Sequence, residues 1–210
     1  MMIEGTVDVS GSTVKIDNSQ ELGNLYILAR RAKDNNNKED AVKYYNMILI
    51  KDPNSWEAAF YTVFFKASDC NIDDIQFAAN SVENCIDTVL TLIKDNVESR
   101  NEKIKAVNEV ASLCMSISNT LYSVTMNHYN LMDMNVKSNY TQEMVNNCCA
   151  ARDILYTLGD KISLMFDEYD ELHVCCINAW AGGIHKHNNL MNNLLNKQLN
   201  KYRYRCVRFV

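Results

Sequence analysis

The sequence predicts an all-α fold, an antiparallel helix-turn-helix array of about seven to nine helices with a short β-hairpin at the N-terminus. The 210 residues include only 6 glycines and 1 proline, fewer turn residues than a chain of many short strands needs. Apolar side chains recur at the spacing of a helix over most of the chain. The hydrophobic content of 47% and the charged content of 22% are ordinary for a globular protein with a buried core.

Residues 1–18 are the exception to the helical pattern, and we interpret them as a small hairpin or a linker. Val7 and Val9 alternate with polar residues, Ser10–Ser12 supplies a turn, and Val14 and Ile16 alternate again. An isolated hairpin is marginal in water, so this one would pack on the first helices or pair with another chain. The helical domain is then expected to span residues 19–196.

The clearest repeat unit covers residues 22–55. Its first helix is expected to end near Asn35, where the polar run 34–40 interrupts the apolar stripe. A second helix follows, and Pro53 ends it because proline biases the preceding residue away from helical geometry. Asn54 or Ser55 then caps a third helix that begins at Trp56.

The unit contains hydrophobic, small, aromatic and proline residues in a characteristic order: Leu25, Leu28, Ala29, Ala41, Tyr45 and Pro53. In this pattern it resembles a tetratricopeptide repeat, a pair of antiparallel helices. The resemblance covers residues 20–70 and a single repeat of about 34 residues. With the opening GTVDVSGSTVKIDNS, the chain is also loosely similar to uncharacterised tetratricopeptide-like proteins of gut-type Gram-positive bacteria.

The resemblance implies a protein-protein interaction scaffold that binds a peptide or protein partner in a groove lined by the first helices of successive units. On that basis, burial of Tyr26 or Tyr61 in the core would contradict the predicted contacts. The expected partner-binding residues are Tyr26, Arg30, Lys33, Tyr61 and Lys66.

Longer helices are expected in the rest of the chain. Apolar stripes predict helices over 75–93 and 102–132, the second broad enough to contact neighbours on two sides. A further helix should run over 141–158 and end at Gly159, since glycine is a common helix terminator. A last helix should run from Leu172 to about Leu195, preceded by acidic residues that favour a helix N-terminus.

Cysteine and histidine residues are the only candidates for metal binding or nucleophilic catalysis. Cys148-Cys149 and Cys175-Cys176 lack the Cys-x-x-Cys spacing of a zinc site, and His185 and His187 lie about 200° apart on a helix. We therefore expect buried free thiols and surface histidines, with no metal or cofactor and no enzymatic activity. A Cys/His-dependent enzyme remains an alternative, which predicts a low-pKa thiol within hydrogen-bond reach of an imidazole.

Charge is distributed unevenly along the chain. Residues 1–171 carry a net charge of −11, whereas residues 172–210 carry +6 and no carboxylate. In the predicted basic tail 197–210, cationic and aromatic residues alternate, so an extended chain would present a cationic face and an aromatic one. The alternative function is therefore nucleic-acid association through this tail. The acidic balance of the whole chain makes nucleic acid the less favoured partner.

The sequence also predicts where the protein resides. No basic segment followed by an apolar one occurs at the start, and the longest strongly apolar run, Ala58–Phe65, is far shorter than the roughly 20 residues that cross a bilayer. We therefore expect a cytoplasmic protein without a membrane span, whose cysteines stay reduced. The pattern does not predict the oligomeric state.

Overall fold

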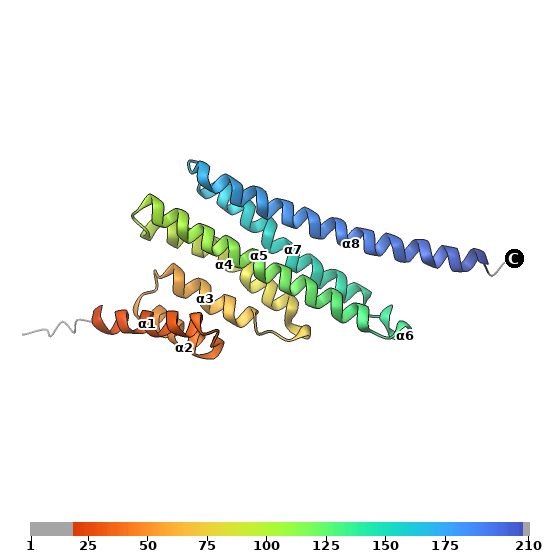
Figure 1. The fold of residues 1–210 in the computed structure, drawn as a ribbon, viewed down its shortest axis with the longest axis horizontal. Coiled ribbons are helices and arrows are strands. Elements are labelled where there is room, and N and C mark those ends of the chain that lie inside the picture. The colour runs from red at the N-terminus through yellow and green to blue at the C-terminus, as the bar shows by residue number, and fades with distance from the viewer. Residues whose placement is uncertain (1–18, 208–210) are drawn as a thin grey trace, which may run out of the picture.

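The computed structural model describes the backbone of residues 19–207 and the side chains of residues 20–196. The regular structure in this range is entirely helical and is arranged as an elongated array (Figure 1). The predicted hairpin falls in residues 1–18, outside the described residues. In chain order the helices, with η for short 3₁₀ helices, are α1 (Ser19–Asp34), α2 (Lys38–Lys51), α3 (Trp56–Ala67), η1 (Ile72–Asp74), α4 (Ile75–Asn96), α5 (Arg100–Leu131), α6 (Met134–Lys137), α7 (Thr141–Met165), η2 (Asp170–Leu172) and α8 (His173–Val207).

The ends of α1 and α2 and the start of α3 agree with the predicted boundaries. Asn36 has a φ of 53° in the turn after α1, a left-handed conformation that asparagine tolerates better than most residues. The side chain of Asn37 then caps α2 by accepting a hydrogen bond from the backbone nitrogen of Asp40. Ser55 caps α3 in the same way, accepting from the backbone nitrogen of Ala58.

The core runs the length of the array. Helices α1, α2, α3 and α4 pack in sequence, each on the next, while α4, α5 and α7 pack mutually and α8 lies against α7 and α5. The largest fully buried apolar side chains of the long helices are Ile75, Ile86, Leu90 and Ile93 on α4 and Ile154, Leu155, Leu158 and Ile162 on α7. None of the helices in the described range combines the length and the apolar character that crossing a membrane requires.

Gly159 does not end its helix, so that prediction was wrong. Helix α7 continues to Met165, and Gly159 is buried inside it. A Cβ at this position would come within 2.5 Å of Nε1 of Trp180 on α8. Gly183 on α8 has the same role, because its Cβ would lie 2.9 Å from Cε1 of Tyr156. These glycines allow α7 and α8 to approach closely.

The last helix is longer than the sequence predicted. Helix α8 continues from His173 to Val207, so its backbone is helical through positions 197–207, which the sequence assigned to a separate tail. The predicted division of that tail into a cationic and an aromatic face required an extended chain. On a helix, alternate residues lie about 200° apart, and the alternation no longer separates the two kinds of side chain.

Candidate functional site

A row of polar contacts joins α1 to α3. The hydroxyl of Tyr26 donates to Oγ of Ser55 at 2.6 Å, and further along Arg30 on α1 pairs with Glu57 on α3. Nζ of Lys33 then lies 3.3 Å from the hydroxyl of Tyr61. Residue numbers rise together along both helices, so α1 and α3 run side by side in the same direction. We call this row the polar seam.

Glu57 is the centre of the polar seam. It is only 7% exposed, yet its carboxylate accepts from Nε of Arg30 at 3.0 Å and from the hydroxyl of Tyr45 at 2.9 Å. A second nitrogen of Arg30 reaches the other carboxylate oxygen at 2.6 Å, which makes the pair bidentate. Burial raises the pKa of Glu57, but the hydrogen bonds from Arg30 and Tyr45 outweigh it and hold the pKa below its ordinary value. The carboxylate is therefore charged, and both of its oxygens accept hydrogen bonds.

Tyr61 belongs to the core, which contradicts its predicted role in partner binding. Its side chain is 3% exposed, and its ring stacks on Tyr45 with centroids 5.2 Å apart. The Tyr61 hydroxyl donates a short hydrogen bond to Glu109 on α5. Lys33 lies over the same ring at 4.5 Å and approaches Glu109 at 3.4 Å. Lys33 and Tyr61 thus connect α1, α3 and α5 inside the array.

Tyr26 and Arg30 instead face a cleft at the edge of the seam. This cleft, of about 430 Å³, lies where α1 and the start of α3 meet the turn between α4 and α5. Tyr26 is half-buried, and the side chain of Arg30 is 58% exposed. The other lining residues are Asp52, Asn54, Ser55, Trp56, Glu57, Asn96 and Val97. We call this hollow the α1/α3 cleft.

The sequence pointed to only part of this lining. Asn54 and Ser55 were assigned capping roles, and Trp56 was read only as the start of a helix. Asn96 and Val97 end a helix that is distant in sequence, and no local pattern connects them to α1. Lys66 lies elsewhere: it lines a separate hollow of about 580 Å³ between the end of α3 and the start of α4, together with the exposed Phe77.

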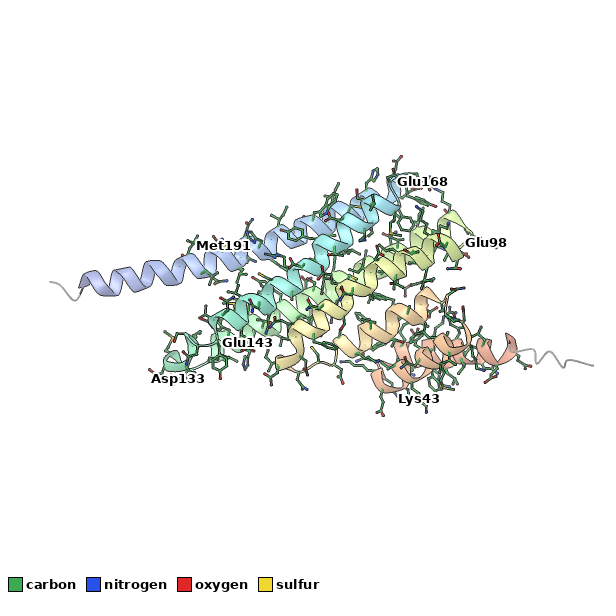
Figure 2. All side chains as sticks on the ribbon, turned by 180° about the vertical axis from the view of Figure 1, so that it is seen from behind. Lys43, Glu98, Asp133, Glu143, Glu168 and Met191 are labelled. Carbon is green, nitrogen blue, oxygen red and sulfur yellow. The ribbon has the colours of Figure 1, made fainter. Side chains whose placement is uncertain are left out.

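The electrostatic character of the α1/α3 cleft is mildly acidic. Arg30 neutralises Glu57, and this leaves Asp52 as the remaining charged residue of the lining. Asp95 and Glu98, both exposed, flank the lining residues Asn96 and Val97 in sequence; Glu98 is labelled in Figure 2. The cleft therefore favours a neutral or cationic ligand.

Among the side chains that the structure describes, the buried cysteine thiols are shifted away from the reactive thiolate form. Burial raises the pKa of the Cys148 thiol to about 12, and it also raises the pKa of Cys175 and Cys176, the opposite of what a nucleophilic thiolate requires. His173 and His185 are exposed. The residues whose placement is described contain no group of three or more His, Cys, Asp or Glu side chains that could hold a metal ion.

Comparison with known proteins adds no identification. Neither the protein-family models nor the curated proteins nor the solved structures give a significant match to this chain. The tetratricopeptide resemblance therefore remains a prediction from the residues of the first unit.

Proposed function

We propose that the protein is a non-enzymatic interaction scaffold whose α1/α3 cleft receives an extended segment of a partner protein. The observation that carries this proposal is the position of the cleft beside the polar seam. One wall is fixed by the bidentate pair of Arg30 and Glu57, and the opposite wall is the turn after α4. A wall held by buried hydrogen bonds loses little conformational freedom when a ligand binds.

The lining suits a peptide. Asn54 and Asn96 carry amides, which match the donors and acceptors of a peptide backbone. Trp56 is partly buried and offers an aromatic surface for an apolar side chain of the partner. Asp52 attracts a lysine or arginine, in keeping with the acidic surroundings. The proposed ligand class is thus an extended segment with a basic residue.

The resemblance to tetratricopeptide repeats supports the same conclusion. In that architecture the first helices of successive units lie side by side and line the binding face. Here α1 and α3 run in the same direction and are joined by the polar seam. In the proposal, Tyr26 and Arg30 keep their partner-contacting role, whereas Tyr61 and Lys33 support the wall from behind.

The test is affinity capture from a lysate of the source organism with three forms of the chain. Asn96→Arg places a long cation in the α1/α3 cleft, and Asn80→Arg makes the same change on the exposed surface of α4, outside the cleft. We expect a discrete protein to be retained by the wild type and by Asn80→Arg, and lost with Asn96→Arg. Retention of the same protein by all three forms, or by none of them, would refute the proposal that the cleft is the binding site.

A further inference from the structure

Helix α8 carries an apolar stripe on its solvent side. The stripe follows alternating steps of three and four residues, the heptad spacing of a coiled-coil seam, and Asn188 is its one polar member. The exposed fractions are 62% for Val174, 59% for Ile177, 52% for Ile184 and 50% for Leu195. The full set is Val174, Ile177, Ala181, Ile184, Asn188, Met191 and Leu195. We call it the outer stripe.

The outer stripe is distinct from the face that α8 buries in the array. The buried residues are also spaced by three and four, but at 100° per residue their mean direction differs from that of the outer stripe by roughly 150°. Figure 1 shows α8 at the border of the array, with its C-terminal end running past the other helices. The buried set is Cys176, Ala179, Gly183, Lys186 and Leu190.

The outer stripe is also free of charge. Between His173 and Asn196 the only lysine, arginine or carboxylate is Lys186, which is 5% exposed and bonded to Asn119 on α5. Seven positions at heptad spacing without a charge match a helix of the same kind better than a charged partner surface. A second copy of α8 presents the same stripe, and a two-fold axis makes such a contact self-complementary.

We propose that two copies of this chain associate through the outer stripe of α8, with the two helices antiparallel. Antiparallel coiled coils place each a residue opposite a d residue. Two registers do so for six of the seven positions. In the one that the end charges favour, Ile177 lies opposite Leu195, Ala181 opposite Met191, and Ile184 opposite Asn188 of the other copy. The two-fold axis then passes close to position 186.

Charge complementarity selects the antiparallel direction and the same register. The acidic run Asp167–Glu171 precedes α8, and its four carboxylate side chains are exposed; Glu168 is labelled in Figure 2. The sequence places Lys201, Arg203 and Arg205 near the other end of the helical backbone. In the antiparallel register each basic end lies alongside the acidic run of the other copy. A parallel pair would instead bring like charges together at both ends.

Asn188 makes this association weaker than that of a fully apolar seam. In the proposed register the two copies of Asn188 lie close to the two-fold axis and opposite Ile184, where an amide loses hydration. A polar residue at an a position lowers coiled-coil stability. We therefore expect a reversible dimer, and Asn188→Leu to tighten it by at least about tenfold.

The first experiment measures association by sedimentation equilibrium from about 1 to about 100 μM, a range that covers affinities from tight to weak. The full chain should approach twice its mass of 24.1 kDa. The double change Ile177→Glu with Ile184→Glu should leave a monomer with unchanged helical circular dichroism, because both side chains are exposed. Leu164→Glu, at a 76% exposed leucine on α7, is the matched control and should still dimerise. A wild-type monomer at the highest concentration, or a dimer unaffected by the double change, would overturn the proposal.

The second experiment tests direction by disulfide formation. In the antiparallel register Ala181 faces Met191 of the other copy, while the two Ala181 residues lie about 15 Å apart along the axis. An equimolar mixture of Ala181→Cys and Met191→Cys should therefore give a covalent mixed dimer on mild oxidation, and Ala181→Cys alone should give none above the wild-type background. Cross-linking of Ala181→Cys to itself would indicate a parallel pair or another register and would refute the proposed arrangement.

Discussion

Replacing Arg30 by methionine should destabilise the protein by about 2 kcal/mol near neutral pH. Breaking a buried ion pair typically costs about 3 to 5 kcal/mol, because the remaining charge stays uncompensated. The Arg30 side chain is 58% exposed, so water can solvate part of the Glu57 carboxylate when the guanidinium is removed. We therefore expect a loss below that range. Methionine preserves much of the length of the side chain and removes the charge. For a chain of this size, the loss corresponds to a fall in Tm of roughly 4 to 8 °C.

The cost should depend on pH with a defined sign. In the wild type the pKa of Glu57 is lowered, so the pair contributes stability above the unfolded value of 4.5, and this stability disappears as pH falls through the folded pKa. Without Arg30, burial dominates and raises the pKa of Glu57. The variant then loses stability as pH rises from 4.5 towards that raised pKa. The difference between wild type and Arg30→Met should therefore be large at about pH 7 and small near pH 4.

The assay is urea unfolding followed by circular dichroism at both pH values, with Glu57→Gln and the double variant completing a cycle. Glu57→Gln keeps an acceptor for Tyr45 and leaves Arg30 solvated, so it should cost only about 1 kcal/mol. When Glu57→Gln is already present, the further change Arg30→Met should cost less than about 0.5 kcal/mol. An equal cost of Arg30→Met at both pH values, or with and without Glu57→Gln, would refute the description of a buried carboxylate that depends on Arg30.

Three further outcomes follow from local geometry. Gly159→Ala should lower the free energy of unfolding in urea by about 1 to 3 kcal/mol and alter the fluorescence of Trp180, because the new Cβ overlaps the indole. Its control, Gly23→Ala, places a Cβ with no atom within 4 Å and should stabilise α1 by about 0.5 to 1 kcal/mol. Ser55→Ala removes the α3 cap and should cost about 1 kcal/mol, measured in the same way. Burial raises the pKa of the Cys148 thiol, so at pH 7 this thiol should react with a thiol reagent no faster than the protein opens. The measurement compares its labelling rate in the folded protein with the rate in a urea-unfolded sample.

Sequence reasoning reached most of the helical boundaries because the signals were local. Pro53 and Ser55 act on their own turn of backbone, so the end of α2 and the start of α3 could be read directly. Gly159 misled because glycine has two uses in helices, as a terminator and as a close-contact residue. Only the position of Trp180 on α8 decides between them, and that contact is tertiary.

The candidate site was less accessible to sequence reasoning. Tyr26 and Arg30 were identified because α1 resembles a repeat helix, yet the same reasoning placed Tyr61 on a surface. Its contact with Glu109 on α5 is what buries it, and no pattern within α3 signals that α5 returns to this point. The opposite wall, at Asn96 and Val97, likewise depends on where α4 ends in space.

Helix length explains why the repeat pattern covers only the first unit. A repeat array propagates when successive helix pairs are equal in length, so that each pair buries the face of the one before. Helix α3 has 12 residues, whereas α4 has 22 and α5 has 32, and α4 packs on α5 and α7 as well as on α3. At α4 the packing therefore changes from a succession of helices, each on the next, to a bundle of α4, α5 and α7. The α1/α3 cleft lies beside this transition, and the last helix of the bundle has an outer face that no later helix within the described residues covers.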